Sequence, residues 1–177
     1  RRLFHIPAEV AVFDKIRKIY DGWARNLEDK GECDWAMGEH LAYASLLTDG
    51  VPVRLSGQDV ERGTFSHRHA VLTVEPGESE YVPLNRLLSG QARFEAYNSL
   101  LSEYAVLGFE YGYASSRPQG LTIWEAQFGD FVNGAQIILD QYLVSAETKW
   151  SRLNGLVLYL PPGHEGQAPE HTSARPE

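Results

Sequence analysis

The sequence is poor in sulfur, and Cys33 is its only cysteine among 177 residues. No disulfide can form within the chain, which favours a reducing compartment such as the bacterial cytoplasm or the mitochondrial matrix. Long apolar runs are also lacking, because no stretch approaches the roughly 18–20 residues that span a bilayer. The start does not have the charged-then-apolar order of a secretory signal. We therefore expect no membrane partner.

A basic face is missing as well. The net charge is -8, and no stripe of lysine and arginine is present that would neutralise phosphates. Short basic stretches around Arg1 and Arg17 are typical of the solvated face of a helix. We therefore expect no nucleic-acid partner.

Several motifs of nucleotide and hydrolytic enzymes are also absent. The sequence contains neither G-x-G-x-x-G, nor G-x-x-x-x-G-K-[ST], nor a G-x-S-x-G elbow. His67 and His69 resemble a metal-binding pair, but no cysteine or other third ligand lies nearby in the sequence. These absences exclude the commonest dinucleotide- and phosphate-binding motifs. They also lead us to expect no metal site.

The pattern that is present predicts an α/β fold. Hydrophobic residues make up 43% and charged residues 23%, as in an ordinary globular domain. Short apolar segments alternate with helical patterns, which favours βαβ units and a parallel β-sheet flanked by helices. We predict strands at 51–57, 121–124 and 156–160, with shorter ones near 70–74 and 81–82, and helices at 7–23, 34–47, 101–115 and 131–150. We expect a helical linker over 1–33 and one domain over 34–177, as a piece of a longer chain.

Chemistry-bearing residues follow the predicted strands. Ligands of open parallel sheets bind outside the carboxyl ends of the strands. Gln127, Phe128 and Phe131 follow the strand at 121–124, and a Gly- and Pro-rich segment leading to His171 follows the strand at 156–160. This collection is typical of a site for a small, partly aromatic ligand. Ordinary turn chemistry explains the glycines and prolines but not the aromatic rings.

Glu103 has two interpretations. With Ser99 or Ser102 as a cap, it is an acidic residue in the first turn of a helix, where it compensates the helix dipole. The helix that follows is apolar nearly all round, which predicts burial. A buried carboxylate needs a partner or a raised pKa, and a carboxyl group that shares a proton suits hydrogen bonding to a ring nitrogen.

Four segments carry a resemblance to a known family. They read RLSGQDVERGTFSHRH at 54–69, LSEYAVLGFEYG at 101–112, WEAQFGDF at 124–131 and GQAPEHTSAR at 166–175. In this order they closely resemble the thiamine-dependent first component of the 2-oxoglutarate dehydrogenase complex. The resemblance covers nearly the whole chain, more weakly before Asp34, and implies the pyrimidine-binding domain of the transketolase-like fold.

The resemblance implies roles for particular residues. Glu103 matches the family's essential glutamate, which hydrogen-bonds a ring nitrogen of the aminopyrimidine of thiamine diphosphate. Phe131, with Phe128 second, matches the aromatic ring that stacks on the pyrimidine. His171 matches an active-site histidine that contacts substrate or intermediate. Weaker candidates for cofactor contacts are Gln127, Asp130 and Gln136.

The resemblance also implies a reaction and partners. The reaction is the oxidative decarboxylation of 2-oxoglutarate, followed by acyl transfer to a lipoyl group. The partners are a small-molecule 2-oxo acid and the lipoyl-bearing succinyltransferase component. The family binds the diphosphate and its magnesium in a separate domain with a Gly-Asp-Gly signature, which this chain lacks, so we expect no metal ligand here. The rest of its own chain and a homodimer mate complete the site, and we expect this chain alone to be inactive. The alternatives are a 2-oxoadipate dehydrogenase of the same family and a non-catalytic assembly domain.

Two positions depart from the family pattern. The family usually has histidine where this chain has Pro162, and glycine where it has Ala168. Both lie in the loop leading to His171, so they bear on the geometry of that loop and on the choice of substrate.

Overall fold

The computed structural model describes residues 2–77, 79–163 and 168–174. Its internal contacts divide the chain into two compact units. The first unit comprises Arg1–Pro52 and Glu61–Phe94, and the second comprises Val53–Val60 and Glu95–Glu177. The domain ranges 1–33 and 34–177 stay a prediction about the longer protein. In the described part of the chain, no helix combines the length and the apolar character that a bilayer crossing requires.

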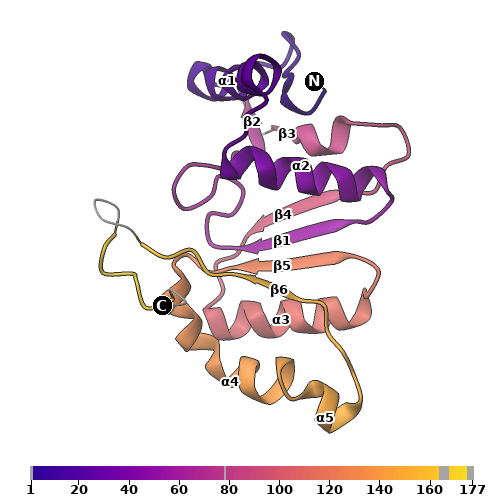
Figure 1. The fold of residues 1–177 in the computed structure, drawn as a ribbon, viewed down its shortest axis with the longest axis vertical. Coiled ribbons are helices and arrows are strands. Elements are labelled where there is room, and N and C mark those ends of the chain that lie inside the picture. The colour runs from indigo at the N-terminus through magenta and orange to yellow at the C-terminus, as the bar shows by residue number, and fades with distance from the viewer. Residues whose placement is uncertain (1, 78, 164–167, 175–177) are drawn as a thin grey trace. The chain divides into compact units, whose positions relative to one another are not determined.

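The second unit is built on a four-stranded sheet with the strand order β4-β1-β5-β6 (Figure 1). The strands are β1 (Val53–Gly57), β4 (Phe94–Asn98), β5 (Leu121–Glu125) and β6 (Val157–Tyr159). β1 pairs with β5 in parallel, and β5 pairs with β6 in parallel. The predicted α/β fold with a parallel sheet is therefore confirmed. Three of the strands match the segments predicted at 51–57, 121–124 and 156–160.

Helix α3 (Glu103–Ser116) follows β4 and packs against β1 and β5 (Figure 1). Ser102 caps it, because its hydroxyl oxygen accepts a hydrogen bond from the backbone N–H of Ala105 at 3.4 Å. The helix, the sheet and the segment after β5 share one apolar core. The buried members of this core are Val106, Leu107, Ala114, Trp124, Ala126, Ala135, Ile138 and Leu156.

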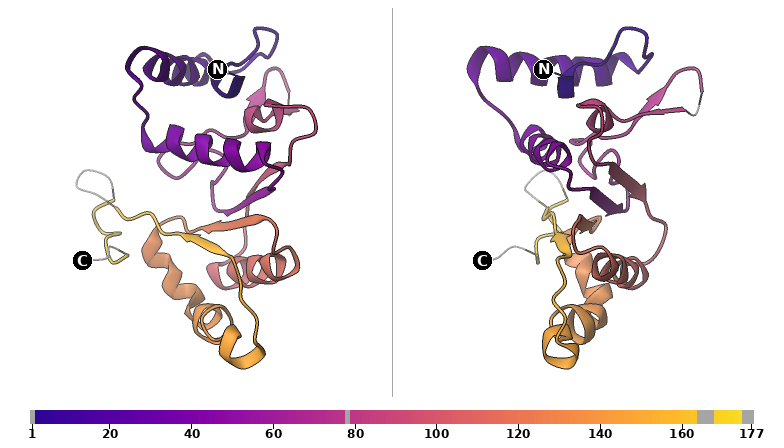
Figure 2. Two further views of the ribbon diagram at one scale, coloured as in Figure 1. Left: turned by 45° about the vertical axis from the view of Figure 1, so that its right-hand side comes forward. Right: turned by 90° about the vertical axis from the view of Figure 1, so that its right-hand side faces the viewer.

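The single helix predicted at 131–150 is wrong. The segment is broken into a 3-10 helix η3 (Gly129–Ala135), α4 (Gln136–Ile138), a π-helical turn η4 (Leu139–Leu143) and α5 (Ala146–Trp150), and the pieces change direction (Figure 2). The buried positions Ala135, Ile138 and Ala146 keep a helical spacing, so the pattern identified the buried face. Gly134 lies inside the segment, and glycine lowers helix stability by about 1 kcal/mol relative to alanine, which favours a break.

The first unit contains two helices and a hairpin. They are α1 (Asp14–Lys30), α2 (Trp35–Thr48), β2 (Leu72–Val74) and β3 (Ser79–Tyr81), with 3-10 turns η1 (Arg2–Phe4) and η2 (Pro83–Arg86). The helix predicted at 34–47 and the short strands near 70–74 and 81–82 are confirmed. The helix predicted from residue 7 begins only at Asp14. The guanidinium of Arg17 donates to the carbonyls of Ile6 and Val10 at 2.9 and 2.6 Å, so these oxygens are satisfied without a helix.

A buried histidine lies at the centre of the first unit. His40 is 0% exposed, and its ring packs against Phe4, Tyr20 and Trp23. Its Nδ1 donates to the carbonyl of Ala36 at 2.8 Å, whereas its Nε2 has no hydrogen-bond partner among the described residues. Burial lowers the pKa of His40, because an apolar environment disfavours the imidazolium form.

Candidate active site

The loops that follow the strands of the second unit meet at one edge of the sheet. The backbone N–H of Ser99, after β4, donates to the carbonyl of Gly57 at the end of β1 at 2.8 Å. The backbone N–H of Ala126, after β5, donates to the carbonyl of Tyr159 at the end of β6 at 3.0 Å. The carboxyl ends of parallel strands therefore lie together, which is where ligands of open α/β sheets bind.

Gly57 is required for this close approach. Its φ is 149°, and a Cβ atom at this position would lie 2.1 Å from the carbonyl oxygen of Glu125. Only a residue without a side chain lets β1 end against β5 in this way.

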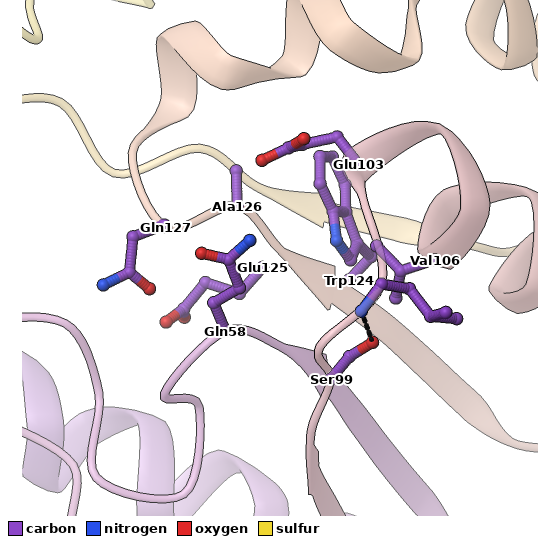
Figure 3. Close-up of a pocket in the computed structure, with 9 residues that line it drawn as sticks. Gln58, Ser99, Glu103, Val106, Trp124, Glu125, Ala126 and Gln127 are labelled. Atoms are coloured by element: carbon purple, nitrogen blue, oxygen red, sulfur yellow. Dashed lines mark hydrogen bonds between the residues drawn. The ribbon is translucent and has the colours of Figure 1, made fainter.

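A small pocket lies at this edge (Figure 3). Its lining residues come from the loops after β1, β4 and β5 and from the first turn of α3, and they are Gln58, Ser99, Leu101, Glu103, Val106, Trp124, Glu125, Ala126 and Gln127. The pocket is too narrow to hold a whole cofactor, so the described residues line at most part of a ligand site.

Glu103 projects its carboxylate from the start of α3 toward the loop after β5 (Figure 3). The prediction that it is buried is wrong, because the side chain is only half-buried. The helix is not covered all round either, since Tyr104 is 49% and Phe109 57% exposed. No described residue hydrogen-bonds to the carboxylate. A Cβ added at Gly134 would lie 3.5 Å from its Oε2, so the backbone of η3 passes close beside it.

The buried carboxylate of α3 is Glu110, a residue that the sequence did not single out. It is 1% exposed, and its two oxygens accept hydrogen bonds from Nε and Nη2 of Arg54 at 2.8 and 2.9 Å. The guanidinium also lies over the rings of Tyr97 and Tyr113, 4.5 and 4.4 Å from their centroids. The sequence contained two signals for this ion pair: an arginine inside a predicted strand, and a glutamate two helical turns after Glu103.

His171 is held in a cluster of rings and one carboxylate. Its Nδ1 lies 3.0 Å from Oδ2 of Asp130. Its ring stacks on Phe128 at a centroid distance of 4.0 Å and an interplanar angle of 10°, and it meets Phe131 edge-on at 5.0 Å and 79°. One face of Phe128 is therefore occupied by the imidazole, whereas Phe131 is 37% exposed.

The two predicted glutamines lie in different places. Gln127 lines the pocket with Glu103, and its Nε2 donates to Oδ2 of Asp59 at 3.1 Å. Gln136 is exposed, and its Nε2 donates to Oδ1 of Asp140 at 2.9 Å within its own helical segment. The structure thus places Gln127 in the pocket and leaves Gln136 outside the set of lining residues.

The loop before His171 contains a backbone conformation that favours glycine. Ala168 has a φ of 48°, and its carbonyl accepts a hydrogen bond from the N–H of His171 at 3.0 Å. The left-handed region costs an alanine roughly 1–2 kcal/mol. Pro162, the other departure from the family pattern, is half-buried. Positions 164–167 and Arg175, which belong to the same predicted loop and motif, lie outside the described residues.

The sequence did not indicate β4, and with it the contribution of Ser99 to the pocket was missed. The segment Phe94–Asn98 buries Phe94 and exposes Tyr97 and Asn98. The only signal was two aromatic residues in a five-residue run, which is weak for an edge strand.

A metal centre is not formed by the residues that the structure describes. None of their histidine, cysteine and acidic side chains gather in groups of three or more that could hold an ion. His67 and His69 of the HRH motif belong to the first unit, and burial lowers the pKa of both.

A family model gives the class of protein to which this geometry belongs. Residues 31–177 match the transketolase, pyrimidine-binding domain. The chain therefore belongs to this family, and the resemblance found in the sequence motifs is confirmed. The roles of individual site residues stay predictions.

Particular relatives are full-length dehydrogenase components. The chain is 53% identical over 177 residues to the 2-oxoglutarate dehydrogenase E1 component of Brucella anthropi, and 54% identical to that of Brucella ovis. All of this chain is matched, but it spans only 18% of the length of each relative.

Proposed function

We propose that this chain is the pyrimidine-binding domain of a 2-oxoglutarate dehydrogenase E1 component and takes part in thiamine diphosphate-dependent decarboxylation of 2-oxoglutarate. The names of its relatives and its family support the proposal. The observation that carries it is the carboxylate of Glu103, which lines a pocket at the carboxyl edge of a parallel sheet and accepts no hydrogen bond from any described residue.

The residues at this edge fit an aminopyrimidine ring. A half-buried carboxylate to which no described residue hydrogen-bonds can share a proton with a ring nitrogen. The exposed part of Phe131 offers an aromatic surface nearby in the chain, whereas Phe128 already stacks on His171. We therefore favour Phe131 for stacking, and Glu103 and Gln127 for polar contacts.

When bound, thiamine diphosphate supplies a nucleophilic carbon and an electron sink for the loss of carbon dioxide. The protein residues set protonation and orientation. Glu103 would hold a proton at the pyrimidine nitrogen. We propose that His171 contacts the 2-oxo acid or exchanges a proton with it.

The remaining parts of the proposed site belong to other segments and molecules. We place the diphosphate and magnesium in another domain of the longer protein, and the completed site at contacts with that domain and with a homodimer mate. The acyl acceptor is a lipoyl group of a succinyltransferase component. A reducing compartment, bacterial cytoplasm or mitochondrial matrix, suits the single, exposed Cys33.

Turnover by the full-length protein tests the proposal. With thiamine diphosphate, magnesium and an artificial electron acceptor, we expect 2-oxoglutarate to be decarboxylated with a higher kcat/KM than 2-oxoadipate. The reverse order supports the 2-oxoadipate alternative. Unchanged turnover in Glu103→Ala refutes the role of Glu103, and an inactive parent that still assembles with its partners supports a non-catalytic assembly domain.

The isolated chain provides a second test. Because the diphosphate-binding part is expected elsewhere, residues 1–177 alone should show no decarboxylation of 2-oxoglutarate with cofactor and magnesium. Measurable turnover by the isolated chain contradicts this division of the site.

A further inference from the structure

Asp130 directs its carboxylate at His171. Both carboxylate oxygens lie within hydrogen-bond distance of Nδ1, at 3.1 and 3.0 Å, and both side chains are 19% exposed. The pair joins the first turn of η3 to the loop after β6.

The contact fixes which ring nitrogen is available. A carboxylate accepts hydrogen bonds, so Nδ1 of His171 must carry the hydrogen. In the neutral imidazole, Nε2 then holds the lone pair and is the atom that can accept a proton or bind a donor. In the imidazolium form, the charge of Asp130 stabilises the ring while Nε2–H donates. In both forms the ring presents Nε2.

The ring orientation is fixed by packing as well. Phe128 covers one face of the imidazole, and Phe131 meets it edge-on. The backbone N–H of Gly129 donates to the carbonyl of Pro161 at 2.9 Å, which holds the residue before Asp130 against the segment after β6. A Cβ at Gly129 would lie 2.7 Å from the carbonyl oxygen of Leu160, so a side chain does not fit there. The one charged group near Nε2 among the described residues is the exposed carboxylate of Glu170, at 3.8 Å, too far for a hydrogen bond.

We propose that Asp130 is a positioning residue that holds His171 through Nδ1, with Phe128 as the clamp on its face, so that Nε2 is presented to the anionic 2-oxo acid substrate. The part that concerns the substrate rests on the proposed function. Asp130 and Phe128 thereby change from candidate cofactor contacts to supports of His171, which leaves Phe131 as the ring for the pyrimidine.

A double-mutant cycle in the full-length protein tests the coupling. Asp130→Asn can turn its amide N–H toward Nδ1 and favour the opposite tautomer, so we expect kcat/KM for 2-oxoglutarate to fall at least about tenfold. In the His171→Ala background the same substitution should change kcat/KM less than about twofold. An equal loss in both backgrounds overturns the proposal. Asp29→Asn, an exposed aspartate of α1, is the matched control.

A chemical readout separates this proposal from the proposed function. Diethyl pyrocarbonate acylates the lone-pair nitrogen of a neutral imidazole, and its reaction with His171 can be followed by mass spectrometry without cofactor or substrate. We expect Asp130→Asn and Asp130→Ala to change the rate at His171 at least threefold, while the rate at exposed His5 stays constant. Unchanged rates at His171 in both variants overturn the positioning role, even in a protein that proves inactive toward 2-oxoglutarate.

Discussion

The first turn of α3 and the third turn of the same helix each carry a glutamate, and the two differ in every contact. Glu103 is half-buried, lines a pocket and has no hydrogen-bond partner among the described residues. Glu110 is 1% exposed and holds Arg54 through two hydrogen bonds. Seven residues apart, the two lie on one face of the helix.

The difference teaches that the buried carboxylate is not the one available for chemistry. A carboxylate that is buried and held by an arginine is out of reach of a ligand, and removing its partner leaves a charge that is costly to bury. A carboxylate at the rim of a pocket keeps its hydrogen-bonding capacity until a ligand arrives. We therefore propose that Glu110 stabilises the second unit and that Glu103 binds the ligand.

The largest expected effect comes from Glu103→Gln in the full-length protein. Glutamine keeps the shape but cannot share a proton as an acid, so kcat for 2-oxoglutarate should fall by about 10²–10⁴-fold, the usual contribution of general acid–base catalysis. Thermal stability should stay within about 0.5 kcal/mol of the parent, because none of the described residues hydrogen-bonds to this side chain. Steady-state kinetics and thermal unfolding measure the two quantities. A kcat within threefold of the parent contradicts the assignment.

Glu110→Gln should have the opposite profile. It leaves the half-covered guanidinium of Arg54 without its counter-charge, and breaking such a pair costs about 3 kcal/mol or more. Hydrogen exchange of the β1 and α3 peptides in the full-length protein should therefore increase. Turnover per folded molecule should change far less than in Glu103→Gln.

The double substitution Arg54→Met with Glu110→Leu provides the control for this pair. Apolar side chains of similar volume remove both charges together, which is often neutral for stability. Protection of α3 should return toward that of the parent. The matched control is Glu147→Gln, since Glu147 is an exposed glutamate of α5. If the α3 peptide exchanges no faster in Glu110→Gln than in Glu147→Gln, the ion pair does not stabilise the helix.

A third test extends the comparison to the first unit, where His40 is buried and hydrogen-bonds only to the carbonyl of Ala36 among the described residues. Burial lowers the pKa of His40, so the folded state disfavours the imidazolium. In the unfolded chain the pKa of His40 is about 6.5. Below that pH the unfolded chain takes up a proton that the folded chain does not, so the free energy of unfolding decreases as the pH is lowered. Glu39, Arg68 and His67 are the charged or titratable groups that act on it.

Hydrogen exchange of the α2 peptide, compared at pH 7.5 and pH 5.5 after correction for the intrinsic rate, measures this effect. We expect protection to decrease on acidification in the parent and to decrease less in His40→Phe, whose ring remains apolar at both values. An equal pH dependence in parent and variant shows that His40 is not responsible.

The smallest effect is expected from the cap of α3. Ser102→Ala removes the hydrogen bond to the backbone N–H of Ala105, which is long at 3.4 Å, so the loss should be about 0.5 kcal/mol. Fraying should be confined to the turn that carries Glu103 and should not reach Glu110. Hydrogen exchange of the α3 peptide resolves this difference, and Ser102→Asp, which retains a cap, should behave as the parent does.

Much of this arrangement could be predicted from the sequence. The buried strands β1 and β5 are short apolar runs, and the turn residues after them locate the edge of the sheet at which Glu103, Gln127 and His171 lie. Local pattern suffices here, because strand burial and strand direction follow from the alternation of strands and helices.

The rest depended on contacts between distant residues. The pairing of Glu110 with Arg54 and of Asp130 with His171 joins positions 56 and 41 residues apart, which no local pattern reports. The exposed rings on α3 misled the prediction of burial at Glu103, because an apolar composition does not say which surfaces this part of the chain covers by itself. The break in the predicted helix after Gly134 depends on tertiary contacts, which the helical periodicity of the sequence does not reveal.

The most direct test of the central claim is the rate of deuterium exchange at the thiazolium carbon of thiamine diphosphate bound to the full-length protein. This rate needs no substrate and reports whether the bound cofactor is activated. We predict that Glu103→Gln slows the exchange at least about 100-fold, whereas Glu110→Gln leaves it within a few-fold of the parent. Equal exchange rates in the parent and in Glu103→Gln, with the cofactor bound in both, would contradict the account.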